Sequence, residues 1–184
     1  MRIIGGRLKG KRLFSIPGKK VRPTADRLRE SIFNILSFRV PEAIVLDLFS
    51  GTGAFGIEAL SRGASHAVFI EKSKEALSVI KRNIQAGKLD RQAQVIRWDV
   101  TKNLNCLRRI AFRYDLVFMD PPYNRDMVQK ALRSLYYGDC LNRGGWVVVE
   151  HSASEPIPEN ISEFAISDQR KYGKTLVTFL TNVL

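Results

Sequence analysis

The chain has 184 residues, of which 45% are apolar and 26% are charged, and its net charge is +12. This length fits one domain with its own core, and the apolar fraction excludes a wholly disordered chain. No apolar run reaches the roughly 20 residues that a membrane-spanning helix needs, and the first residues lack the apolar stretch of a secretory signal. The two cysteines, Cys106 and Cys140, have no neighbouring Cys or His at metal-ligand spacing. We therefore expect no disulfide framework and no metal site, and a cytoplasmic protein.

Most of the positive charge lies at the N-terminus. Residues 1–30 contain ten Lys and Arg side chains against Asp26 and Glu30, so this segment carries +8 of the net +12. A basic segment ahead of a nearly balanced domain favours a polyanionic partner, although a solvated flexible tail is the simpler alternative. Apolar residues such as Ile3 and Leu13, and glycines spaced as in turns, favour an ordered, β-rich extension.

The rest of the chain alternates between strand and helix patterns. In chain order the sequence predicts a helix at 24–38, a strand at 43–48, a helix at 54–62, a strand at 66–71, a helix ending at Gly87, strands at 94–98 and 115–120, a helix at 126–137 and a strand at 146–151. Two last strands, 164–169 and 175–181, are predicted to form a hairpin. This order predicts a mostly parallel sheet covered by helices on both faces, with an antiparallel edge.

The first candidate site is the glycine-rich segment from Asp47 to Gly56 between a predicted strand and a predicted helix. Gly51, Gly53 and Gly56 match G-x-G-x-x-G, in which glycines allow close backbone approach and the helix start offers free N–H groups. Glu71 ends the next strand, where a carboxylate accepts hydrogen bonds from ribose hydroxyls. The pattern favours a nucleoside-bearing cofactor; a simple tight turn would leave Glu71 and the buried charge of Asp47 unexplained.

The second candidate site is the run Asp120-Pro121-Pro122-Tyr123, which closes a later strand at the same edge of the sheet. Two prolines lack N–H groups, so the Asp120 carboxylate and the proline carbonyls are rigid acceptors, and Tyr123 offers a face for stacking. Acceptors beside an aromatic ring suit the exocyclic amine of a nucleobase. The alternative is a strand-ending turn with Tyr123 as ordinary packing.

These segments together resemble class I methyltransferases that modify nucleobase amines, and within them the RsmD family. The resemblance covers nearly the whole chain and is carried by residues 3–10, 22–30, 47–53 and 56–64. It implies a Rossmann-like α/β fold with a seven-stranded, mostly parallel sheet whose last strand is antiparallel. It also implies transfer of a methyl group from S-adenosyl-L-methionine to N2 of a guanine in 16S ribosomal RNA, with residues 1–23 as a basic RNA-contacting extension and 24–184 as the methyltransferase domain.

The resemblance also assigns roles to residues. The loop that would hold the methionine part of the cofactor comprises Asp47, Ser50, Gly51, Thr52 and Gly53. Glu71 would accept from the ribose, and Asp99 and the Val100 N–H would bind the adenine. Asp120, Pro121, Pro122 and Tyr123 would receive the base. Phosphate contacts are expected from Arg7, Lys9, Lys11, Arg12, Arg22, Thr24 and Arg27.

Two other functions fit parts of the sequence. A DNA adenine-N6 methyltransferase would share the Asp120–Tyr123 run, and a NAD-dependent oxidoreductase would share the glycine pattern. We expect a monomer whose partner is ribosomal RNA or the assembling small subunit. Deleting residues 1–20 is expected to weaken RNA binding and to leave cofactor binding largely intact.

Overall fold

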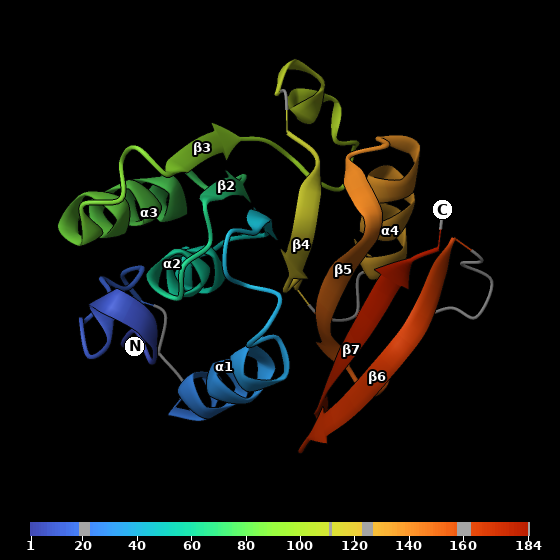
Figure 1. The fold of residues 1–184 in the computed structure, drawn as a ribbon, viewed down its shortest axis with the longest axis horizontal. Helices are drawn as coiled ribbons and strands as arrows, with labels where there is room; N and C mark the ends of the chain where they lie inside the picture. Colours follow the sequence, from blue (N-terminus) through green and yellow to red (C-terminus); the bar gives the residue numbers. More distant parts are fainter. Residues whose placement is uncertain (19–22, 111, 123–126, 158–162, 184) are drawn as a thin grey trace.

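A computed structural model describes residues 1–18, 23–110, 112–122, 127–157 and 163–183. A seven-stranded sheet runs through the middle of the molecule in the order β3-β2-β1-β4-β5-β7-β6 (Figure 1). The strands are β1 (Ile44–Leu48), β2 (His66–Glu71), β3 (Ala93–Arg97), β4 (Tyr114–Met119), β5 (Leu141–Ser152), β6 (Phe164–Tyr172) and β7 (Thr175–Asn182). The first five are parallel, and β7 is antiparallel to both β5 and β6, which confirms the predicted fold class.

Helices cover both faces of this sheet, as the alternating pattern predicted. The helical elements are η1 (Gly6–Leu8), α1 (Pro23–Ile35), α2 (Ala54–Ser61), α3 (Lys74–Gly87), η2 (Asn105–Arg109) and α4 (Met127–Tyr137). One core cluster joins α1, α2 and α3 to side chains such as Val45 and Phe69, and a second joins α4 and η2 to alternating neighbours such as Leu46 and Ile70. Adjacent strand residues therefore face opposite cores, as expected for a sheet buried on both faces.

The boundaries differ from the prediction at several places, among them the end of β6, which lies at Tyr172 rather than at 169. Helix α1 ends at Ile35 rather than near Phe38, and the 3-10 helix η2 was not predicted. Strand β5 begins at Leu141, five residues earlier than predicted, because Gly144 and Gly145 indicated a loop. These glycines instead lie in an irregular part of the β4–β5 pairing. Tyr114 pairs with Leu141 and Leu116 pairs with Trp146, so β5 contains extra residues between these two pairs.

The N-terminal extension is ordered over residues 1–18 and packs on the helical face of α1, α2 and α3. Its β structure is a single antiparallel bridge between Arg2 and Arg12 around η1, rather than a meander. Ile3 and Leu13 are buried in the first core cluster. The basic extension is therefore part of the folded domain.

Glu58 on α2 anchors this extension. Its side chain is fully buried, and its two carboxylate oxygens accept from Ile4 N at 2.8 Å and Gly5 N at 2.7 Å. Arg62 Nε lies 2.8 Å and Arg29 Nε 3.5 Å from the same carboxylate. Two backbone donors and two guanidinium groups thus compensate the buried charge.

Candidate cofactor and base site

The candidate site lies where the parallel strands end. Residues Leu48, Ile70 and Met119 are paired in register across β1, β2 and β4, so the segments that follow these strands leave the sheet at the same edge. Ligands of open α/β sheets bind at this carboxyl edge. The fold therefore brings the glycine-rich loop, Glu71 and the run beginning at Asp120 to one side of the sheet.

The glycine-rich loop is held by hydrogen bonds to the first two strands. Ser50 Oγ donates to the carbonyl of Asp47 at 2.6 Å, and Gly51 N donates to Glu71 Oε2 at 2.9 Å. Gly53 has a φ of +78° at the N-cap of α2, a left-handed conformation that glycine adopts without strain. A Cβ on Gly56 would lie 2.3 Å from Cε1 of Phe69, so this glycine lets α2 pack closely on β2.

The side chain of Asp47 caps the N-terminus of α2. It is 2% exposed, and Oδ2 accepts from Gly56 N at 2.9 Å. Burial raises the pKa of Asp47 to about 8, although the Gly56 hydrogen bond lowers it, and the nearby charge of Glu71 raises it further. Asp47 therefore holds the helix that follows the loop and is largely protonated at neutral pH.

Glu71 organises the turn after β2. Besides Gly51 N, its carboxylate accepts from Lys72 N at 2.7 Å and Ser73 N at 2.9 Å. A carboxylate has about four acceptor positions. A ribose hydroxyl at Glu71 would therefore take the remaining position or share one with the Gly51 N–H.

Asp99 follows β3 and faces the same side. Its Oδ2 pairs with Lys72 Nζ at 2.7 Å, and Oδ1 accepts from Thr101 Oγ1 at 2.7 Å and Thr101 N at 3.2 Å. The hydrogen bond from Lys72, then those from Thr101, lower the pKa of Asp99 to about 2. Asp99 is therefore ionised at any physiological pH and also caps the following turn.

A cavity of about 490 Å³ lies between these groups. It is lined by Phe49, Ile70, Glu71, Lys72, Ser73, Arg97, Trp98, Asp99, Val100, Thr101, Pro122 and Met127. Of the predicted cofactor residues, Glu71, Asp99 and Val100 line it, whereas Asp47, Ser50, Gly51, Thr52 and Gly53 do not.

The sequence prediction missed several residues of this cavity. Phe49 and Trp98 are the first residues after β1 and β3. Their position directly after a parallel strand could have identified them. Lys72 follows Glu71 in the same way. Met127, the first residue of α4, has no comparable local signal.

The predicted base-binding run begins beside this cavity. Asp120 is exposed, Pro121 is buried, and Pro122 lines the cavity. Tyr123 lies outside the described residues. Asp120 therefore lies at the same edge of the sheet as the cavity, two residues before Pro122, which lines it.

The predicted phosphate-binding residues differ in their surroundings. Lys9, Arg12 and Arg27 are exposed. Arg7 is also exposed but donates to Gln92 Oε1, and Lys11 Nζ donates to the carbonyl of Ala86. Arg22 and the side chain of Thr24 lie outside the described residues. Arg29, in the same stretch of arginines, is 2% exposed and paired with Asp26 and Glu58, so it faces the interior.

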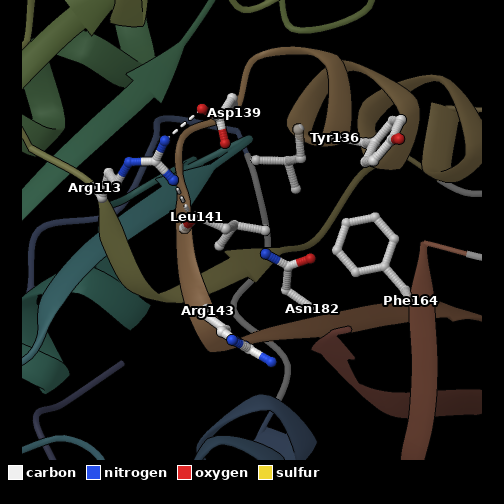
Figure 2. Close-up of a pocket in the computed structure, with 8 residues that line it drawn as sticks. Arg113, Tyr136, Asp139, Leu141, Arg143, Phe164 and Asn182 are labelled. Atoms are coloured by element: carbon white, nitrogen blue, oxygen red, sulfur yellow. Dashed lines mark hydrogen bonds and ion pairs between the residues drawn. The ribbon is translucent and has the colours of Figure 1, made fainter. Parts of the chain in front are cut away.

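A second, smaller cavity of about 180 Å³ lies at the opposite edge of the sheet (Figure 2). Figure 2 shows Arg113 turned toward Asp139, with which it forms an ion pair, and Arg113 Nη1 donates to the Leu141 carbonyl at 3.1 Å. The first residues of β5 and β6 and the last of β7 also line it. None of the predicted site residues line it.

Two features are absent from the described residues. No helix among them is long and apolar enough to cross a membrane. Within the same part of the chain, no group of three or more His, Cys, Asp and Glu side chains is placed to hold a metal ion.

Comparisons with known proteins identify the family. A family model described as Conserved hypothetical protein 95 matches residues 1–181. The chain is 34% identical to the Bacillus subtilis protein YlbH over 175 residues, which is 95% of each chain. It is 33% identical over 165 residues to the Ribosomal RNA small subunit methyltransferase D of Haemophilus influenzae, covering 87% of this chain and 84% of that one. The solved structure of Escherichia coli yhhF matches with a TM-score of 0.87 at 28% identity and covers 99% of this chain and 97% of that chain. The chain therefore belongs to the Conserved hypothetical protein 95 family of RsmD-like, class I methyltransferases, whose cofactor is S-adenosyl-L-methionine.

Proposed function

We propose that this methyltransferase transfers the methyl group of S-adenosyl-L-methionine to the exocyclic N2 of a guanine in small-subunit ribosomal RNA. One observation carries the proposal: Pro122, in the Asp120-Pro121-Pro122 run, lines the same cavity as Glu71, Asp99 and Val100. Groups suited to a nucleoside and groups suited to a base amine are thus adjacent.

The cavity fits the cofactor in size and chemistry. Its volume of about 490 Å³ lies within the usual range for small-molecule sites. Glu71 would accept from the ribose hydroxyls, and Asp99 and Val100 N would bind the adenine edge. Phe49, Trp98 and Met127 provide apolar surface for the adenine ring. When bound, the cofactor supplies a methyl group on a positively charged sulfur.

The residues after β4 are suited to orienting an aryl amine. The lone pair of such an amine is delocalised into the ring, so attack requires the nitrogen to be held in line with the methyl carbon, about 3 Å away. Hydrogen bonds from the amine to the Asp120 carboxylate and the Pro121 carbonyl would hold it there. They would also stabilise the positive charge that develops on nitrogen.

The carboxylate favours guanine over adenine. Guanine presents N1–H and N2–H side by side, so Asp120 would accept from both, whereas adenine presents an acceptor at N1. The exposed side chains of Lys9, Arg12 and Arg27 would contact RNA phosphates. The Haemophilus influenzae relative named for ribosomal RNA methylation supports the same substrate class.

The proposal is tested by incubating the protein with labelled S-adenosyl-L-methionine and ribosomal RNA, assembled small subunits or duplex DNA. Label on guanine N2 in RNA or subunits is expected, and the modified nucleotide is then mapped. Label on adenine in duplex DNA would instead support the adenine-N6 alternative and contradict the proposal.

Asp120→Asn tests the role of the carboxylate. Loss of a charge-assisted hydrogen bond costs about 1.5–3 kcal/mol, so kcat/KM on guanine should fall roughly tenfold to 150-fold. Asp139→Asn, an exposed carboxylate at the opposite edge of the sheet, is the matched control and should retain activity. Activity of Asp120→Asn within about threefold of the parent would refute the two-point contact to guanine.

A further inference from the structure

Asn83, on the side of α3 that faces the N-terminal extension, contacts two segments far apart in the sequence. It is 2% exposed, and its Oδ1 accepts from Phe14 N at 2.7 Å. Its Nδ2 donates to the carbonyl of Phe14 at 3.2 Å and to the carbonyl of Thr52 at 3.0 Å. One side chain thus joins the basic extension to the glycine-rich loop.

The chemistry of these contacts requires an amide. Asn83 presents one acceptor to Phe14 N–H and both amide hydrogens to two different carbonyls, so all its donors are used. A carboxylate would lose both donor bonds, and an apolar side chain would leave three partly buried backbone groups without this partner. Backbone groups left without a partner destabilise the contact, so this position favours asparagine.

Other contacts hold the extension against the same two elements. The guanidinium carbon of Arg82 lies 3.6 Å from the centre of the Phe14 ring, and Lys11 Nζ donates to the carbonyl of Ala86 near the end of α3. Thr52 Oγ1 also donates to Sδ of Met1 at 3.6 Å. The extension therefore contacts the loop directly through Met1 and indirectly through Asn83 of α3.

The opposite end of the loop is tied to the cavity. Gly51 N donates to Glu71 Oε2, and Glu71 lines the cavity, whereas Phe14, Thr52 and Asn83 do not. A ribose hydroxyl at the remaining acceptor position of Glu71 would fix the carboxylate that also holds the Gly51 N–H. The next residue in the loop is Thr52, whose carbonyl accepts from Asn83, so Glu71 and Asn83 hold adjacent residues of the same loop.

We propose that Asn83 is a positioning residue that couples the basic extension to the cofactor loop, so that cofactor and RNA bind with positive cooperativity. This departs from the expectation that deleting residues 1–20 leaves cofactor binding largely intact. The RNA half of the proposal rests on the proposed function, whereas the coupling between cofactor and extension does not. Coupling is reciprocal, so RNA held by the extension would tighten cofactor binding by the same factor.

Hydrogen exchange on the intact protein tests the coupling without RNA. S-adenosylhomocysteine, whose binding is measured by calorimetry, should slow exchange of the Phe14 amide by about fivefold or more, the lower end of typical coupling. In Asn83→Leu this effect should fall below about twofold even when the ligand is saturating. Gln85→Leu, an exposed position on the same helix, is the matched control and should behave like the parent.

Two results would overturn the proposal. One is unchanged exchange at Phe14 in the parent protein at saturating ligand, and the other is full protection retained in Asn83→Leu. Where Asn83→Leu does not fold, Asn83→Asp keeps the acceptor for Phe14 N and removes both donors, and the parent measurement stands by itself. If the parent protein shows the exchange effect but does not methylate ribosomal RNA, the proposed substrate is wrong and the coupling still holds.

RNA affinity provides the second arm of the test. Binding of a small-subunit ribosomal RNA fragment should tighten about fivefold with S-adenosylhomocysteine in the parent and in Gln85→Leu. In Asn83→Leu the two affinities should agree within about twofold. Equal enhancement in all three proteins would show that any cooperativity passes by another route.

Discussion

Asp47 makes the stability of this protein depend on pH in a direction opposite to that of most carboxylates. Its burial raises the pKa to about 8 from an ordinary value of 3.8. Between these two values the folded protein keeps a proton that the unfolded chain has lost. Because the folded state then binds more protons, stability is greatest near the lower end of this window and falls as pH rises toward 8.

The size of the effect follows from one proton. A full proton difference changes the free energy of unfolding by about 1.36 kcal/mol per pH unit, so raising the pH from 5 to 7 should cost about 2.5 kcal/mol. Asp47→Asn keeps an oxygen that can accept from Gly56 N and removes the titration. Relative to the parent, the variant should therefore gain about 2.5 kcal/mol over the same interval.

Urea unfolding at pH 5, 6 and 7, followed by the fluorescence of Trp98 and Trp146, measures this difference. Comparing the two proteins at each pH removes the contributions of all other titrating groups to first order. A difference between parent and variant that stays constant within about 0.5 kcal/mol would refute the inference that Asp47 is protonated in the folded state.

Three further substitutions test the packing and charges around the site. Gly56→Ala places a Cβ 2.3 Å from the Phe69 ring. Thermal unfolding should show the folded state destabilised by about 1–3 kcal/mol, with partial recovery when Phe69→Leu is added. Glu58→Gln removes the buried charge that pairs with two arginines and should cost about 3–5 kcal/mol in urea unfolding; an unchanged midpoint would show that the carboxylate is not needed to anchor the extension. Asp99→Asn should weaken S-adenosylhomocysteine binding about tenfold by calorimetry, and the parent affinity should show no Asp99 titration between pH 5 and 9 because the pKa of Asp99 is about 2. Full affinity in that variant would assign Asp99 to the turn alone.

The strands were predictable because buried parallel strands are short apolar runs, and β2 was predicted at its observed bounds, His66–Glu71. The order of the strands then brings Glu71, Asp99 and Pro122 to one edge. The start of β5 was not predictable, because Gly144 and Gly145 have the composition of a loop and only pairing with β4 makes them part of a strand.

The contacts of polar side chains were the least predictable part of the site. Asp47 was predicted to hold the methionine part of the cofactor, and in the fold its Oδ2 caps α2. Asn83 carries no local signal, because an asparagine inside a helix gives no indication of partners 31 and 69 residues away. Such long-range hydrogen bonds depend on packing that hydrophobic periodicity does not encode.

The position of β7 has a consequence for how the chain is made. β7 pairs on one side with β5 and on the other with β6, so β6 has no neighbour in the sheet until β7 is present. A nascent chain that ends before Thr175 exposes the unpaired edge of β5 from Trp146 to Ser152, and such edges favour association with other chains. The cooperative closure of this sheet must therefore wait until β7 has left the ribosome, and stop codons within β7 should yield aggregating rather than merely inactive protein.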